Sequence, residues 1–297
     1  MQYMLYLWLF HIHLQKMAES LITIKQALKL TLTNSKIQRL EANILLAHVI
    51  NQSKEYLITH DNEILTMQQI LEYNKLCEKA EQDYPIAYIL GNQEFYGLEF
   101  KVTENVLIPR QDTELLVDFA IKHAPINASI LDMGTGSGAI AVALKYNRQD
   151  INMYACDISQ NALDIAKINA ENNKVKINFL YSDWFDNLLN ENTNIKFDMI
   201  ITNPPYIHKD DRHLTQEIRF EPRIALTDEK DGLKHIRNII QNAKNFLNLE
   251  SYLAIEHGYN QSEDVQDIFL EHGYSNIEHI IDLGGYVRVT YARITAL

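Results

Sequence analysis

Apolar residues recur at helical spacing in the first quarter of the chain. Ile24, Leu28 and Leu32 follow one another every four residues, and segments 44–49 and 67–76 also carry apolar residues at helical spacing. Residues three or four apart share one face of a helix, so each segment can bury an apolar stripe. No glycine interrupts the region. The pattern predicts a small bundle of helices over residues 19–84.

From about residue 127 onward, short apolar runs alternate with helical segments. The expected strands are 129–133, 152–156, 178–181, 198–202 and 252–256, and the expected helices are 139–146, 161–172, 234–247 and 262–272. Such alternation is typical of a mostly parallel sheet with helices on both faces. Two last apolar segments, 277–282 and 288–294, lie close enough in sequence to pair antiparallel. An α/β domain is therefore expected.

The segment between these two regions has a pattern of its own. Pro85 ends the helical stretch, because proline cannot continue a helix that precedes it. Aromatic and β-branched residues then surround Gly91 and Gly97, which is typical of strands joined by a turn. We expect a β-hairpin linker over residues 85–110 and the larger α/β domain over residues 111–297.

The first residues stand apart from this organisation. The stretch from Tyr3 to Leu14 is apolar and aromatic, but about a dozen residues are too few to span a bilayer. No basic region precedes it and no small-residue cleavage site follows, so a signal peptide is not indicated. We expect residues 1–18 to be an extension with the natural start at Met17; the alternative is an extra helix packed on the first domain.

Composition and charge narrow the class of function. Hydrophobic residues make up 46% of the chain and charged residues 22%, which excludes disordered and fibrous proteins. The net charge is −12, and residues 91–297 carry −11 of it. Such a balance argues against unassisted binding to a phosphate backbone and suits a basic protein partner. Cys77 and Cys156 are too few for a disulfide framework, which fits a reducing cytoplasm.

A glycine-rich loop follows the expected strand 129–133. Its sequence is Gly134-Thr135-Gly136-Ser137-Gly138, which places three of the 10 glycines within five residues. Without Cβ atoms these residues let a ligand lie against the backbone, beside the free N–H groups that open the next helix. The spacing differs from the dinucleotide fingerprint G-x-G-x-x-G. The loop predicts a cofactor site at the carboxyl edge of the sheet.

Polar residues also end the next two expected strands. Asp157 lies 19 residues beyond Gly138, where a carboxylate can accept hydrogen bonds from ribose hydroxyls. Asp183 and Trp184 end the third strand, where a carboxylate can read adenine N6 and an indole can stack on a ring or shield it. Trp184 alone would also fit a partly buried packing residue. Together these positions predict an adenosine pocket, which suits either a dinucleotide or S-adenosylmethionine.

The motif Asn203-Pro204-Pro205-Tyr206 follows the expected strand 198–202. Its two prolines have no N–H group, so carbonyl oxygens dominate the exposed polar surface. The Asn203 side-chain oxygen and the Pro204 carbonyl can accept both hydrogens of an –NH₂ group, while Tyr206 offers a flat face to the planar group behind it. Holding both N–H bonds orients a poorly nucleophilic nitrogen toward an electrophile.

The glycine loop, Asp157 and the Asn-Pro-Pro-Tyr motif together resemble the class I S-adenosylmethionine-dependent methyltransferases that act on amino groups. From about residue 20 the chain is similar to the peptide chain release factor glutamine N5-methyltransferases, the PrmC/HemK family. The stretches that carry this similarity are 88–91, 94–95, 107–114, 182–185, 219–222 and 256–258. Segment 107–114 discriminates best, because nucleic-acid amino-methyltransferases generally lack it; Gln111 stands where the family usually has proline.

The resemblance implies a Rossmann-like fold: a mostly parallel seven-stranded sheet with an antiparallel final strand, plus a small N-terminal helical domain that docks the substrate. It implies that the glycine loop holds the methionine end of S-adenosylmethionine, that Asp157 binds the ribose, and that Asp183 and Trp184 border the adenine. Asn203 would contact the cofactor as well. No metal is required.

The implied substrate is the glutamine of the Gly-Gly-Gln motif in class I release factors, whose methylation aids peptide release on the ribosome. Residues Asn203, Pro204, Pro205 and Tyr206 would hold its side-chain amide for in-line transfer from the sulfonium. The implied location is cytoplasmic, with neither a membrane nor a nucleic acid as partner. Arg110 and Glu114 either bridge the two domains or line the substrate entrance.

Three other functions fit parts of the pattern. An adenine-N6 or guanine-N2 methyltransferase of nucleic acid would use the same Asn-Pro-Pro-Tyr chemistry, but it calls for a basic groove, which the acidity of residues 91–297 argues against. A binding module without activity would leave the intact motif unexplained. A nicotinamide oxidoreductase would also leave it without a purpose.

Overall fold

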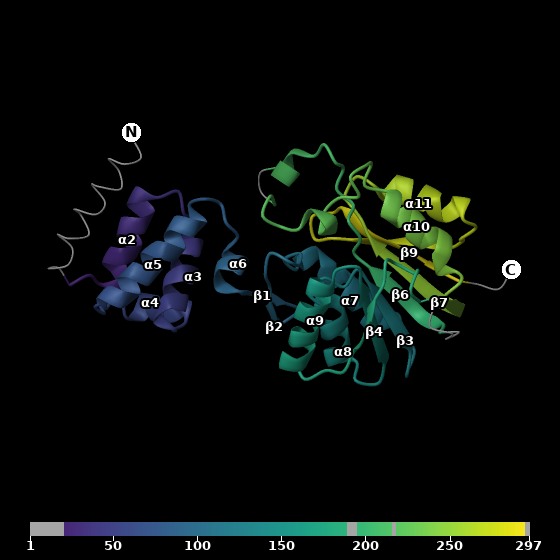
Figure 1. The fold of residues 1–297 in the computed structure, drawn as a ribbon, viewed down its shortest axis with the longest axis horizontal. Coiled ribbons are helices and arrows are strands. Elements are labelled where there is room, and N and C mark those ends of the chain that lie inside the picture. The colour runs from purple at the N-terminus through teal and green to yellow at the C-terminus, as the bar shows by residue number, and fades with distance from the viewer. Residues whose placement is uncertain (1–20, 189–194, 216–217, 295–297) are drawn as a thin grey trace. The chain divides into compact units, whose positions relative to one another are not determined.

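The computed structural model describes residues 21–188, 195–215 and 218–294, and the chain divides into two compact units that meet in sequence between Leu90 and Gly91 (Figure 1). The expected extension at residues 1–18, with its start at Met17, lies outside the described residues. Among the helices in the described ranges, none combines the length and the apolar character that a membrane crossing needs.

The first unit is a helical bundle. Its helices are α2 (Ile24–Asn34), α3 (Arg39–Ile50), α4 (Lys54–Thr59), α5 (Met67–Ala80) and α6 (Ile86–Leu90). Helices α2 and α5 each begin with a capping box, in which Thr23 or Thr66 accepts a hydrogen bond from the backbone of the third helical residue. Their apolar faces enclose a core that includes Leu45 and Tyr73. The predicted N-terminal helical region is confirmed.

The second unit begins with a hairpin and continues into a sheet. The hairpin strands are β1 (Asn92–Phe95) and β2 (Leu98–Lys101), and the sheet strands are β3 (Ser129–Met133), β4 (Asn152–Asp157), β5 (Asn178–Tyr181), β6 (Phe197–Thr202), β7 (Leu247–Glu256), β8 (Ile277–Ile281) and β9 (Val287–Arg293). Within the described ranges the sheet has seven strands in the order β5-β4-β3-β6-β7-β9-β8. Strand β9 runs antiparallel to both neighbours and the other pairs are parallel. The predicted fold class is confirmed.

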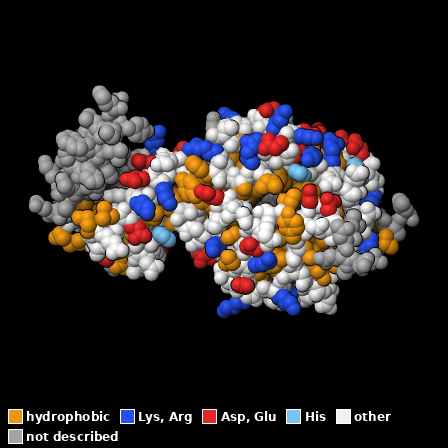
Figure 2. All heavy atoms as spheres, in the orientation of Figure 1, with side chains coloured by type: hydrophobic (Ala, Val, Ile, Leu, Met, Phe, Trp, Pro, Cys, Tyr) orange, Lys and Arg blue, Asp and Glu red, His pale blue; other side chains and the backbone are white. Residues whose placement is uncertain are grey.

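The surface of the second unit carries charges of both signs. On the face shown in Figure 2, acidic and basic side chains are interspersed and no continuous basic stripe is seen. This mixture lies on a unit whose formal net charge is −11.

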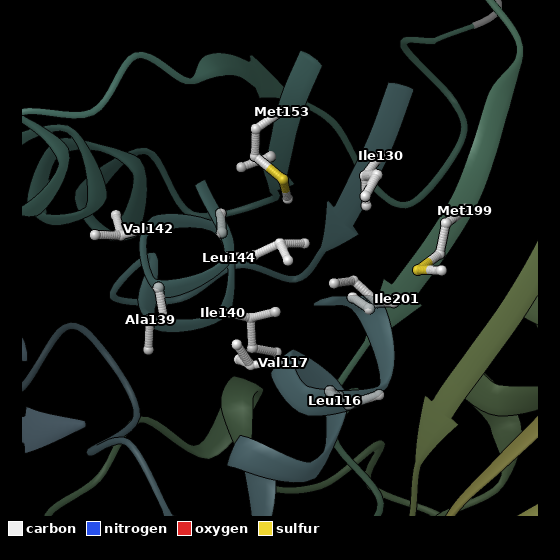
Figure 3. Close-up of a cluster of buried hydrophobic side chains, with 14 of the residues drawn as sticks. Leu116, Val117, Ile130, Ala139, Ile140, Val142, Leu144, Met153, Met199 and Ile201 are labelled. Carbon is white, nitrogen blue, oxygen red and sulfur yellow. The ribbon is translucent and has the colours of Figure 1, made fainter. Parts of the chain in front are cut away.

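Helices cover both faces of the sheet. They are α7 (Glu114–His123), α8 (Ala139–Asn147), α9 (Gln160–Asn172), α10 (Lys234–Ala243) and α11 (Ser262–Glu271), with short 3₁₀ turns at η1 (Gln111–Thr113), η2 (Arg212–Thr215) and η3 (Arg223–Ala225). Successive residues of a strand point to opposite faces. Ile130 of β3 therefore packs with Leu116 and Ile140 of α7 and α8 (Figure 3), whereas Leu131 packs in the core formed with α10 and α11.

The structure differs from the sequence prediction in several places, and helix α10, for example, ends four residues earlier than expected. The hairpin occupies only residues 92–101; at the start of the expected linker the Pro85 carbonyl accepts the first hydrogen bonds of α6, so a helix follows the proline. Helix α7 was not expected, although Leu116, Val117 and Ala120 have helical spacing. Strand β7 begins five residues earlier than expected, at Leu247, because its pairing with β6 shifts register ahead of Tyr252 and breaks the apolar pattern.

Candidate active site

A cavity in the second unit lies at the carboxyl ends of the parallel strands. Its lining residues come from seven places in the chain: Asn105, Val106, Leu107, Pro109, Arg110 and Thr113; Gly134, Thr135, Gly136, Ser137, Ala139 and Ile140; Asp157, Ile158, Ser159 and Ala162; Ser182, Asp183 and Trp184; Asn203 and Pro205; Pro222, Ile224 and Ala225; and His235. This is the edge at which open parallel sheets bind their ligands.

The sheet register brings the sequence motifs together. Met133 of β3 pairs with Cys156 of β4 on one side and with Thr202 of β6 on the other. The next residues along the chain from these three positions therefore lie at the same level, at the edge of the sheet. Gly134 begins the glycine loop, Asp157 is the predicted ribose acceptor, and Asn203 begins the Asn-Pro-Pro-Tyr motif. Motifs far apart in sequence thus share one cavity.

The glycines of the loop have different surroundings. Gly136 lines the cavity, and a Cβ atom built on it would meet no atom within 4 Å. The space above its backbone is therefore open for a ligand. Gly138 is not part of the cavity lining, because it faces α9, where a Cβ atom would come within 3.0 Å of Ala166. Its lack of a side chain lets the loop approach that helix.

Thr135 turns its side chain toward the sheet. Its hydroxyl donates to Asp132 Oδ2 at 2.6 Å, and its backbone N–H donates to the carbonyl of Cys156 at 3.0 Å. Asp132 is fully buried; burial raises the pKa of this carboxyl to about 7, and the Thr135 hydrogen bond opposes the rise. Ser137 is buried and its carbonyl accepts from Asn169 of α9. The sequence reasoning did not single out Asp132, which anchors the loop.

Asp157 is fixed by the backbone around it. Its Oδ2 accepts from Gly136 N at 2.9 Å and its Oδ1 accepts from Ser159 N at 2.8 Å. Burial raises the pKa of Asp157, while these backbone hydrogen bonds lower it. Each carboxylate oxygen can accept a further hydrogen bond. The residue therefore lines the cavity as an oriented acceptor for hydroxyl donors.

Trp184 is held by a residue that the sequence reasoning missed. Its indole Nε1 donates to His235 Nδ1 at 3.2 Å, and its ring lies against Gly134. Because Nδ1 accepts, His235 is neutral with its proton on Nε2. Burial lowers the pKa of His235, which favours that neutral form. Asp183 is exposed beside them and lines the same cavity.

The Asn-Pro-Pro-Tyr motif divides between the cavity and the interior. Asn203 and Pro205 line the cavity, whereas Pro204 is buried and neither it nor Tyr206 is part of the lining. Asn203 Nδ2 donates to Thr113 Oγ1 at 3.1 Å, which leaves its Oδ1 as an acceptor. Tyr206 Oη donates to Glu256 Oε1 at 3.3 Å. Neither Thr113 nor Glu256 was expected at the site; their only sequence signal was membership of segments 107–114 and 256–258.

One wall of the cavity is tied together by a buried carboxylate. Glu221 Oε2 accepts from Ile108 N at 3.0 Å, and its Oε1 pairs with Arg110. Segments 105–110 and 222–225, which both contribute lining residues, are joined in this way. Glu114 has a different role, since its Oε1 accepts from Tyr96 N at the turn of the hairpin. Within the described ranges no group of three or more His, Cys, Asp and Glu side chains is arranged to hold a metal ion.

Comparison with known proteins adds relatives for both units. Residues 24–91 match the PrmC N-terminal domain family, and residues 111–229 match the Methyltransferase small domain family. The chain is 40% identical over 260 residues to the release factor glutamine methyltransferase of Neisseria gonorrhoeae, covering 87% of this chain and 94% of that protein. It is 39% identical over 264 residues to the protein of that name from Aliivibrio fischeri, covering 88% and 92%.

A solved structure is similar in fold. The methyltransferase from Pyrococcus furiosus aligns with a TM-score of 0.51 over 74% of this chain and 98% of that one. At 15% sequence identity this similarity concerns the fold alone.

Proposed function

The chain belongs to the release factor glutamine methyltransferases, and on that basis we propose that it methylates the side-chain amide nitrogen (N5) of the Gly-Gly-Gln glutamine in class I peptide chain release factors, with S-adenosylmethionine as methyl donor. The observation that carries the chemistry is the position of Asn203. Its Nδ2 is held by Thr113, so its oxygen is the atom available to a substrate at the cavity. A release-factor substrate would place the reaction in the cytoplasm.

The hydrogen-bonding groups that line the cavity suit S-adenosylmethionine. Gly134, Thr135, Gly136 and Ser137 would face the methionine end, where the open space above Gly136 supports a close approach. Asp157 would accept from the ribose hydroxyls, and Asp183 and Trp184 would border the adenine. Gly138 acts indirectly, by seating the loop on α9. When bound, the cofactor supplies an electrophilic methyl group on its sulfonium.

The substrate amide would be held by the Asn-Pro-Pro-Tyr motif. Asn203 Oδ1 and the Pro204 carbonyl accept the two N–H groups, and the Tyr206 ring supports the amide plane. Conjugation with the carbonyl makes an amide nitrogen a weak nucleophile, so orientation and electrostatic stabilisation supply the catalysis. The two oxygens hold the N–H groups until the nitrogen, on accepting the methyl group, releases one proton to water.

The charge distribution supports a protein substrate over a nucleic acid. Residues 91–297 carry a net charge of −11, and the face in Figure 2 mixes acidic and basic side chains. An acidic enzyme can recruit a basic domain electrostatically, and such attraction acts mainly on the rate of association. The same charge opposes a phosphate backbone.

Removing the predicted ribose acceptor should weaken cofactor binding. In Asp157→Ala the ribose hydroxyls lose a buried acceptor, which should cost roughly 1–3 kcal/mol of binding free energy. Isothermal titration calorimetry with S-adenosylmethionine measures this directly. Asp164→Ala removes an exposed carboxylate from α9 and is the matched control, with unchanged affinity expected. Unchanged affinity in Asp157→Ala would remove this residue from the site.

The substrate assignment is tested by comparing an intact release factor with a short peptide. Mass spectrometry should show one added methyl group on the Gly-Gly-Gln glutamine of the intact factor, and none on a factor in which that glutamine is alanine. A Gly-Gly-Gln peptide should react far more slowly, because one amide offers few contacts. Raised salt should slow methylation of the intact factor, because it screens the attraction between factor and enzyme. Equal rates for peptide and factor would contradict docking of the whole factor. Methylation of RNA or DNA, with none on the factor, would contradict the proposed substrate itself.

A further inference from the structure

A buried carboxyl lies behind the Asn-Pro-Pro-Tyr motif without a full set of partners. Glu256, the last residue of β7, is 1% exposed. Its Oε1 accepts from Tyr206 Oη at 3.3 Å, and the neighbouring Thr113 hydroxyl lowers the pKa of this carboxyl, as a hydrogen-bond donor does. No residue in the described part of the chain gives Oε2 a well-aligned hydrogen bond. An under-satisfied buried carboxyl is destabilising, so its presence here calls for an explanation.

Thr113 connects this carboxyl to the cavity. It stands where η1 runs on into α7, and its backbone there is already helical, with φ −67° and ψ −17°. Here its side chain makes no capping bond. The hydroxyl lies instead between Glu256 and Asn203 Nδ2, from which it accepts at 3.1 Å. The hydroxyl is thus placed to join the two residues.

We propose that Glu256 and Thr113 are positioning residues that fix the polarity of Asn203, so that its side-chain oxygen faces the substrate amide. The proposal rests on the function proposed above, since it concerns how the glutamine –NH₂ group is recognised. It assigns no bond-forming step to either residue. Both act through Asn203.

The polarity follows from counting protons. An ionised Glu256 can only accept, so the neighbouring Thr113 hydroxyl interacts with it through its single proton. The Thr113 oxygen can then only accept from Asn203, which places Nδ2 toward Thr113 and Oδ1 away from it. A substrate –NH₂ group offers donors, so this is the orientation that recognition needs. Glu256 also accepts from Tyr206, and one carboxylate therefore orients both polar side chains of the motif.

A neutral group at position 256 would undo this order. A protonated carboxyl or an amide can donate to Thr113, which frees the threonine proton to point toward Asn203. The Asn203 amide can then turn, and its NH₂ group would face the substrate NH₂ group, donor against donor. Specific sites reject a ligand strongly when buried polar groups are left unpaired in this way.

The charged groups around Glu256 set when it is ionised. Burial raises the pKa of Glu256 to about 7; the hydrogen bond from Thr113 lowers it, nearby Asp112 raises it, and Tyr206 and Arg288 lower it. Arg288 is shared, because it also pairs with Asp112 at 2.9 Å. The ionised form therefore prevails only above about pH 7, and turnover should fall as pH drops through that value.

Two other buried groups in this domain have shifted pKa values. His257, the residue after β7, bonds to Gly258 and Thr290, and burial lowers its pKa. Asp132, beneath the glycine loop, has a pKa of about 7 like Glu256. The wild-type pH profile alone does not separate Asp132 from Glu256. The profile of a Glu256 variant does.

The primary test compares two substitutions of Thr113. Thr113→Val keeps the shape and removes the hydroxyl, and kcat on an intact release factor should fall about 10²-fold, as expected for a misplaced catalytic group. Thr113→Ser keeps the hydroxyl and should retain most of the activity. KM for the factor and calorimetric affinity for S-adenosylmethionine should change little in both. A purely structural role predicts the reverse order, because serine leaves a small cavity and valine does not.

Glu256→Gln is the second arm. Its kcat should fall, and the decline of turnover below about pH 7 should disappear, because the titrating group is gone. Asp198→Asn makes the same carboxyl-to-amide change at the other end of the sheet, where Asp198 accepts from Ser129 N and Asn248 Nδ2. This control should keep wild-type kcat and the wild-type pH profile.

The outcomes are distinguishable. A wild-type enzyme that does not methylate the factor overturns the proposed function itself. If the wild-type enzyme methylates the factor and Thr113→Val keeps full kcat, the positioning role alone is overturned. The same holds if Thr113→Ser loses as much kcat as Thr113→Val. If turnover of Glu256→Gln still declines below about pH 7, the positioning role is also overturned, and Asp132 becomes the titrating group to test.

Discussion

Asn203→Ala should lower kcat for release-factor methylation by about 10²–10³-fold, by analogy with the loss of one oriented hydrogen-bonding group from an oxyanion hole. The variant removes the only side-chain oxygen that the motif presents at the cavity, since Tyr206 is bonded to Glu256 behind it. Affinity for S-adenosylmethionine should be largely preserved, because the amide oxygen is proposed to act on the glutamine. The effect therefore belongs to turnover and not to cofactor binding.

Single-turnover kinetics with saturating cofactor, and mass spectrometry of the factor, would measure this loss. Asn238→Ala on the exposed side of α10 is the matched control and should leave turnover unchanged. Tyr206→Ala should be milder, because it damages the supporting face and keeps both acceptors. If Asn203→Ala turns over at the wild-type rate, the proposed recognition of the amide is wrong.

Among Gly→Ala substitutions at the site, Gly232→Ala should lower the stability of the fold most. Gly232 has φ +80°, and a Cβ atom there would lie 2.1 Å from the backbone carbonyl oxygen of Tyr206. That oxygen is already held by Gln261 Nε2 at 3.1 Å. The left-handed conformation and the clash together should destabilise the fold by roughly 2–4 kcal/mol. Relief of the clash must move the end of the catalytic motif, so kcat should fall as well.

Gly285→Ala separates the two contributions. Gly285 has φ +85°, and a Cβ atom on it would meet nothing within 4 Å. It should lose only the conformational part, about 1–2 kcal/mol, with unchanged turnover. Urea unfolding of the full chain and initial rates would give both quantities. Equal destabilisation by the two substitutions would show that the Tyr206 carbonyl is not held against Gly232.

The sequence by itself determined the fold class and the main motifs. Strands β3 and β5 span the residues that the apolar runs predicted, and β4 and β6 differ by one residue. These features are local: side-chain periodicity, glycine permissiveness and proline geometry act over a few residues. The family resemblance, carried by short stretches of sequence, also anticipated the relatives found by comparison.

Parallel topology then explains why the predicted site residues converge. Once β3, β4 and β6 are adjacent and in register, the residues at their carboxyl ends meet at one edge. The glycine loop, Asp157 and Asn203 are therefore placed together by the order of the strands. Their individual roles in binding and catalysis remain predictions for the experiments above.

Only the tertiary structure decided where each side chain of the site points and what holds it. Gly138 faces α9, Trp184 is bonded to His235, and Asn203 is bonded to Thr113, 90 residues earlier. The raised pKa of Glu256 likewise depends on burial. Hydrogen-bond partners and desolvation are set by atoms that packing brings close, and no spacing within a single segment contains that information.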